Sequence, residues 1–317
     1  MSLTSDMMVD RRRLRRQLTF WRVIAVLAVL GALIGVGLAI RGAGESAHIA
    51  RMRIDGLITG KQETLDLLRE IEKSKAQAVV LRINSGGGTT SGSEALYNGV
   101  RQLASKKPVV AIIDGVGASG AYMAALGAER IVANGSAIVG SVGVIAQIPN
   151  VSKLLDTLGV KVESVRSSPL KAMPSGVEPT SPEARAALEQ TVTDTYRWFR
   201  ALVGERRRLE GDALANVADG RVFTGRQALE LKLIDALGDE SAAITWLEAE
   251  KGLKKDLRVR DYKPKSQRSG VPGLSALDGL ARLFGIAVPE GVDEAAQRLL
   301  GAQALEGLVS VWQPAQP

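Results

Sequence analysis

Hydrophobic residues along most of the chain recur with two spacings, one typical of strands and one typical of helices. RMRIDGLI (51–58) alternates in the manner of a strand, and 63–71 has the spacing of an amphipathic helix. AQAVVLRI (76–83) and PVVAII (108–113) are apolar runs typical of buried strands. Each of these two runs is followed by glycines and then by a predicted helix, the first ending near Leu103 and the second spanning about 119–128.

The alternation continues in shorter elements after residue 128. Pro182 stands at the start of a long predicted helix, in the first-turn position that proline tolerates, and this helix runs to about Leu209. The other predicted elements are strands at 130–133, 142–146 and 161–166, a strand–helix–strand unit at 220–235 and a helix near 239–250. Repeated β-α alternation predicts an α/β fold with a mostly parallel sheet covered by helices.

The N-terminal 40 residues differ in character from the rest. Residues 1–22 hold six arginines against two aspartates, and an uncharged apolar run of 18 residues follows at 23–40. As a helix this run would span about 27 Å, close to the ~30 Å hydrocarbon core of a bilayer. Because arginine and lysine stay on the cytoplasmic side, we predict a basic cytoplasmic tail at 1–22 and a single-pass transmembrane anchor at 23–40. A cleaved signal peptide is the less favoured alternative, since its apolar region is usually only ~7–15 residues long.

The remainder of the chain divides into three parts. We predict a linker at 41–50, a compact domain at 51–262 on the outer side of the membrane, and a C-terminal tail at 263–317. The tail is rich in Gly, Pro and Gln, and its apolar end GLVSVW suggests the hypothesis that it lies in a substrate groove.

Composition narrows the possible chemistry. The chain has no cysteine, which excludes a disulfide framework, a thiol nucleophile and cysteine-ligated metal sites. His48 is the single histidine, so it offers the one position for a Ser-His-Asp triad. We expect chemistry without imidazole, and neither a metal nor a cofactor. More than half of the net charge of +7 lies in 1–22, beside the apolar run, and we therefore expect no nucleic-acid partner.

Two glycine-rich segments follow predicted strands. GVGASG (115–120) matches G-x-G-x-x-G, but the acidic residue that a dinucleotide site needs after the next strand is missing, since that strand ends in Asn134. Ser119 begins the following helix, where it either caps the helix or acts as a nucleophile beside the Gly120 amide. INSGGG (83–88) places three glycines after a strand, where backbone amides can turn toward a developing oxyanion.

Four segments together resemble the signal peptide peptidase A family, membrane-anchored serine peptidases of bacterial envelopes. They are NSGGG, GASGAYMAA, ANGSAIVGSVGVI (133–145) and GRVFTGRQALELKLID (220–235), so the resemblance covers about 51–250. It implies a ClpP/crotonase-like fold of repeated β-β-α units within the 51–262 domain. It also implies a bacterial inner-membrane location, with the peptidase domain on the outer side.

The resemblance further implies a Ser/Lys dyad. Ser119 aligns with the family's nucleophile, and Lys171 lies where the family has its general base, in VRSSPLKAMPSGVEPTSPEAR. To accept a proton near pH 7, this lysine needs a pKa about three units below its ordinary value of ~10.4. Desolvation would lower the pKa by that amount at a cost of roughly 4 kcal/mol. Lys153 and Lys161 are competitors, but we interpret them as an exposed helix position and a strand edge.

Further roles follow from the same resemblance. The amides of Gly88 and Gly120 would hold the oxyanion, and Ser141 and Ser168 could support the lysine amine by hydrogen bonds. Family members build rings in which the lysine comes from a neighbouring domain or protomer, so a homo-oligomer is expected. The implied substrates are released signal peptides or other apolar peptides.

The chain departs from the family pattern at three positions. Gly86 stands where the family usually has proline, Ser168 where a glycine is common, and Lys232 where a glycine often ends a helix. None of these changes removes a catalytic group. Two other functions stay open: a crotonase-type acyl-CoA enzyme of the same fold, and a catalytically inactive envelope scaffold.

Overall fold

The computed structural model describes residues 19–28, 31, 46–264 and 309–311, which belong to two compact units, Met1–Ala47 and His48–Pro317. In the first unit, 19–28 and 31 are helical. Among the described residues there is no helix with the length and apolar character needed to cross a membrane. Most of the predicted anchor at 23–40 lies outside the described residues, so it stays a prediction.

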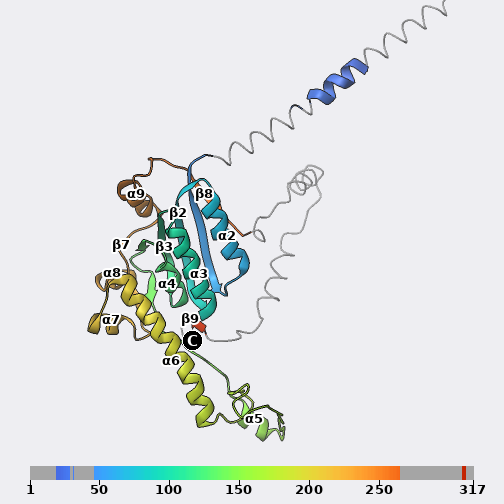
Figure 1. The fold of residues 1–317 in the computed structure, drawn as a ribbon, viewed down its shortest axis with the longest axis vertical. Helices are drawn as coiled ribbons and strands as arrows, with labels where there is room; N and C mark the ends of the chain where they lie inside the picture. Colours follow the sequence, from blue (N-terminus) through green and yellow to red (C-terminus); the bar gives the residue numbers. More distant parts are fainter. Residues whose placement is uncertain (1–18, 29–30, 32–45, 265–308, 312–317) are drawn as a thin grey trace, which may run out of the picture. The chain divides into compact units, whose positions relative to one another are not determined.

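The second unit is built on one mixed sheet, which in the described part of the chain has nine strands (Figure 1). They are β1 (His48–Ile58), β2 (Ala76–Thr89), β3 (Val109–Ala118), β4 (Arg130–Ala133), β5 (Ile138–Gly140), β6 (Val222–Thr224), β7 (Ala236–Leu237), β8 (Val259–Tyr262) and β9 (Val309–Val311). The strand order along the main path of the sheet is β6-β5-β3-β2-β1-β8. Off this path, β4 pairs with β3, β7 pairs with β4, and β9 pairs with β2. The β5–β6 and β2–β9 pairs are antiparallel and the other pairs are parallel, which confirms the predicted α/β class.

Helices cover both faces of this sheet. The described helices of this unit are α2 (Gln62–Lys73), α3 (Thr90–Ala104), α4 (Gly120–Ala125), α5 (Ser152–Thr157), α6 (Pro182–Arg207), α7 (Gly211–Val217), α8 (Gly225–Glu230) and α9 (Glu240–Lys251), of which α5 lies away from the sheet (Figure 1). Alternating residues of β2 separate two cores: Leu81 packs with the core that includes α2, α3 and α4, whereas Val80 packs with Leu247 of α9. The alternation follows from the two-residue period of strands.

Most predicted elements are confirmed, but two strands are wrong. β5 ends at Gly140, because Ser141 turns the backbone to a φ of 53°, so 142–146 is not a strand. Residues 161–166 have no regular structure, since no described strand lies beside them to complete their backbone hydrogen bonds.

Three boundaries also differ from the prediction. β1 begins at His48, so the predicted linker at 41–50 is too long by three residues. The glycine-rich segments predicted as loops are the ends of strands, because β2 continues to Thr89 and β3 to Ala118.

A projecting segment, residues 145–180, leaves the sheet after β5 and returns at α6; we call it the arm. In Figure 1, α5 within the arm lies beyond the N-terminal end of α6, away from the sheet and α4. No residue from 143 to 175 is buried. Many of its large apolar side chains are exposed: Ile145, Ile148, Val151, Leu154, Leu158, Val160, Val162, Val165 and Leu170. An exposed apolar surface of this kind marks an interaction site.

Candidate active site

Ser119 joins β3 to α4 in a backbone conformation that serine rarely adopts. Its φ is 55° and its ψ is −122°, and such strain in a non-glycine residue is concentrated at functional sites. The Ser119 amide donates to the Gly140 carbonyl at 2.7 Å, and its carbonyl accepts from the Met123 amide at 3.0 Å. The side chain makes no capping hydrogen bond to α4, so the interpretation of Ser119 as a helix cap is wrong. Its hydroxyl therefore remains a candidate nucleophile.

The two glycines predicted to hold the oxyanion lie against each other beside Ser119. A Cβ added to Gly120 would lie 3.2 Å from the Gly88 amide nitrogen and would overlap the hydroxyl oxygen of Ser93. A Cβ added to Gly88 would overlap the backbone of Ile58 in β1. Glycine is therefore required at both positions, and the close approach places two backbone amides at the junction where Ser119 stands.

Ser141 is brought close to this junction by its preceding residue. The Gly140 carbonyl accepts the Ser119 amide hydrogen bond, and Ser141 follows with a φ of 53°. Its own amide donates to the Arg221 carbonyl at 2.8 Å, and its side chain is buried. Ser141 thus directly follows the residue that binds the Ser119 amide, and its supporting role stays a prediction.

Lys171 and Ser168 lie on the arm instead. The Lys171 amide donates to the Ser168 carbonyl at 3.1 Å, and both side chains are exposed. Ser119, in contrast, is only 1% exposed at the start of α4. A single chain therefore does not bring Lys171 to Ser119. The competing Lys153 and Lys161 are also exposed on the arm.

His48 takes no part in this site. It is buried at the first position of β1, with Nε2 2.9 Å from the Tyr262 hydroxyl oxygen. Gly88 pairs with Ile58 at the other end of the same strand, about 30 Å away at 3.3 Å per residue. A Ser-His-Asp triad at Ser119 is therefore excluded. Within the described residues, no cluster of three or more His, Asp or Glu side chains could hold a metal ion.

A short strand from the C-terminal tail lies beside the glycine-rich end of β2. Val309–Val311 pairs in antiparallel register with Gly87–Thr89, whose Gly87 and Gly88 also pair with β1. The backbone of β2 next to the candidate site therefore accepts an extended segment. The hypothesis that the GLVSVW end of the tail lies in a substrate groove stays a prediction.

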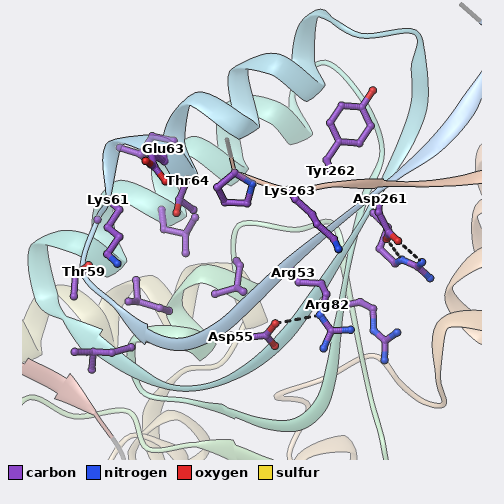
Figure 2. A pocket seen from close by; sticks show the side chains of 18 residues that line it. Arg53, Asp55, Thr59, Lys61, Glu63, Thr64, Arg82, Asp261, Tyr262 and Lys263 are labelled. Atoms are coloured by element: carbon purple, nitrogen blue, oxygen red, sulfur yellow. Dashed lines mark hydrogen bonds and ion pairs between the residues drawn. The ribbon is translucent and has the colours of Figure 1, made fainter. Parts of the chain in front are cut away.

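A cavity lies beside β1. Figure 2 shows this space of about 600 Å³, lined by the second half of β1, the start of α2 and the end of β8. Arg53 pairs with Asp55 at 3.1 Å on its wall, and Arg51 pairs with Asp261. Hydrogen bonds from Arg51 hold the pKa of Asp261 below its ordinary value. None of the predicted catalytic residues lines this cavity, although Ile58 on its wall packs against Gly88.

Comparisons with known proteins agree on one family. Residues 101–254 match Peptidase family S49. A Synechocystis sp. protein named "Putative protease slr0021" is 36% identical over 226 residues, which cover 69% of this chain and 82% of that protein. The Arabidopsis thaliana "Serine protease SPPA, chloroplastic" is 32% identical over 185 residues, which cover 58% of this chain and 27% of that longer protein.

Among solved structures, a mutant of the "1510-N membrane-bound stomatin-specific protease" is 16% identical, with a TM-score of 0.46 over 69% of this chain and 99% of that one. This overlap is too loose to carry an argument about the site. The "Putative protease MJ0651" of Methanocaldococcus jannaschii is 32% identical over 248 residues, which cover 78% of this chain and 76% of that protein. On these similarities the chain belongs to peptidase family S49, as a signal peptide peptidase A-like protein.

Proposed function

We propose that the chain is a membrane-anchored serine endopeptidase that degrades released signal peptides with a Ser119/Lys171 dyad. The observation that carries the proposal is the conformation of Ser119, which is strained, does not cap α4 and stands beside the amides of Gly88 and Gly120. We also infer the ClpP/crotonase-like fold, since strands followed by helices repeat along the mixed sheet.

The proposed reaction is acyl transfer to serine followed by hydrolysis. Ser119 Oγ attacks the scissile carbonyl carbon while the neutral Lys171 amine takes the hydroxyl proton. The amides of Gly88 and Gly120 donate to the oxyanion of the tetrahedral intermediate. Lys171 then gives its proton to the leaving amine, and a water molecule hydrolyses the acyl-enzyme with the lysine again acting as base.

A second copy of the chain would supply the lysine. The arm carries Lys171 away from its own sheet, and its exposed apolar residues need a covering partner. Docking onto a neighbour would remove water from around the lysine, which is what a lysine base requires. Hydrogen bonds from Ser141 of the receiving copy and Ser168 of the donating copy could orient the amine.

The proposed substrate is an extended apolar peptide. The end of β2 already accepts an extended segment at Gly87–Thr89, and backbone pairing of this kind binds peptides with little regard to sequence. With an anchor at 23–40, the site would stand just outside the bacterial inner membrane, where signal peptides are released. This placement rests on the sequence pattern of 1–40.

The test is peptidase activity of the full-length chain in detergent on an apolar reporter peptide. Ser119→Ala and Lys171→Ala are each expected to abolish activity without changing the assembly measured by size-exclusion chromatography. Lys161→Ala is the matched control, since it is another exposed lysine of the arm, and should stay active. Activity that survives in Ser119→Ala or Lys171→Ala would refute the dyad. An inert, assembled wild type would instead favour the scaffold, and binding of coenzyme A would favour the crotonase-type enzyme.

A further inference from the structure

We propose that the ion pair between Arg166 and Glu178 is a positioning device that holds the Lys171 loop in the shape a neighbouring active site receives. The inference rests on the proposed function, in which Lys171 acts as base in a second copy. It assigns a role to two residues that touch neither the peptide nor the reacting atoms.

The pair closes the loop that carries the lysine. Arg166 Nη1 donates to Glu178 Oε2 at 2.8 Å, and Nη2 donates to Oε1 at 2.7 Å, a two-pronged arrangement that fixes orientation as well as distance. Ser164 Oγ adds a third hydrogen bond to Oε1 at 2.9 Å. The two side chains are only 20% and 22% exposed, and Lys171 lies between them in the sequence.

A second set of contacts ties the end of the loop to the segment before α5. Asn150 Nδ2 donates to the Glu178 carbonyl at 3.0 Å, and the Val151 amide donates to the Gly176 carbonyl at 2.8 Å. Gly176 has a φ of +76°, and a Cβ there would lie 2.5 Å from the Pro149 carbonyl oxygen. The base of the loop is thus fixed while its tip, at Lys171, points into solvent.

Polar contacts fix the shape of this loop, because apolar packing does not. No residue from 143 to 175 is buried, so the arm has no core of its own. A catalytic base must be placed closely, since an error of about 1 Å can cost around a hundredfold in rate. Breaking the ion pair should therefore lower kcat, while KM is unchanged because the peptide binds along β2.

The first test compares kinetics of full-length variants. Glu178→Gln and Arg166→Glu are expected to lower kcat roughly ten- to hundredfold. The charge-reversed double variant Arg166→Glu/Glu178→Arg should regain most of the wild-type kcat, because it restores a pair of opposite charges. Glu189→Gln is the control: it breaks the exposed Arg185–Glu189 pair on α6, which closes no loop, and should leave kcat unchanged. Wild-type kcat in Glu178→Gln, or loss of assembly in that variant, would overturn the positioning role.

The second test uses mixed assemblies to locate the effect. Ser119→Ala chains keep the lysine and Lys171→Ala chains keep the serine. A mixture of the two should be active, because each kind of chain supplies the residue that the other lacks. Glu178→Gln placed on the lysine-donating chain should reduce that activity, whereas the same change on the serine-donating chain should not. Equal effects on both chains would overturn the inference. An inactive parent mixture would refute the lysine in trans, and the kcat of Glu178→Gln would still decide whether the ion pair positions the loop.

Discussion

Replacement of Gly120 by alanine tests the packing of the candidate oxyanion site. The added Cβ would lie 2.9 Å from Ser93 Cβ and 3.2 Å from the Gly88 amide nitrogen, and would overlap Ser93 Oγ. Gly120 does not have a left-handed φ, so the substitution adds no backbone strain. Both Gly120 and Ser93 are buried, so neither residue can swing into solvent to relieve the overlap.

The expected cost is that of overpacking a rigid site. Inserting a methyl group into a packed core costs about 1–3 kcal/mol, and part of this is offset because alanine favours a helix over glycine by up to ~1 kcal/mol. We expect Gly120→Ala to lower the free energy of unfolding by about 2 kcal/mol. Displacement of the Gly88 amide should also reduce kcat, since loss of one oxyanion donor costs roughly a hundred- to a thousandfold.

A double-mutant cycle with Ser93 measures whether this overlap is the cause. Ser93→Gly removes the two side-chain atoms that the new methyl group meets, so Ser93→Gly/Gly120→Ala should lose less stability than the sum of the single changes. Ser93→Ala should cost little by itself, because Ser93 Oγ is buried and finds no hydrogen-bond partner among the described residues. Unfolding free energies from denaturant titration provide the assay. Additivity within about 0.5 kcal/mol would refute the reasoning.

Three further predictions concern other contacts of the fold. Tyr122→Phe removes the buried hydroxyl that donates to the Leu233 carbonyl at 2.7 Å. It should lower the free energy of unfolding by about 1–3 kcal/mol, and an unchanged melting temperature would contradict this. Deletion of 307–317 removes β9 from β2 and should raise kcat/KM for a reporter peptide; equal values would exclude competition by the tail. Asp261→Asn should make the free energy of unfolding less dependent on pH in the acid range. Arg51 lowers the pKa of Asp261, so its contribution is present above the unfolded pKa of ~3.9 and is lost as pH falls through the lower folded value.

The sequence predicts elements well where burial and periodicity coincide. The run 76–83 is apolar because β2 is central in the sheet, so its pattern correctly predicts a strand. The run 161–166 is also predicted as a strand, but its Val162 and Val165 are exposed and no strand among the described residues lies beside it. Local pattern reports which side chains avoid water, but not what covers them.

The candidate site was likewise predictable from the sequence only in part. Serine followed by glycine after an apolar strand indicated the position of Ser119, but its φ of 55° depends on the distant Gly140 carbonyl that binds its amide. The Arg166–Glu178 pair was not found from the sequence, because an arginine and a glutamate twelve residues apart in an irregular segment carry no periodic signal. Lys232 keeps a left-handed backbone, with a φ of 60°, whereas the replacement of the usual glycine there predicts the loss of a left-handed residue.

The separation of Lys171 from Ser119 within one chain would make a solitary copy of this enzyme inert. A newly synthesised molecule would carry a nucleophile without its base, and so would be harmless to the envelope proteins around it. Under the proposed mechanism, activity begins only when enough copies meet, and specific activity falls on dilution. The concentration of the chain would then control its activity, with no need for a removable propeptide.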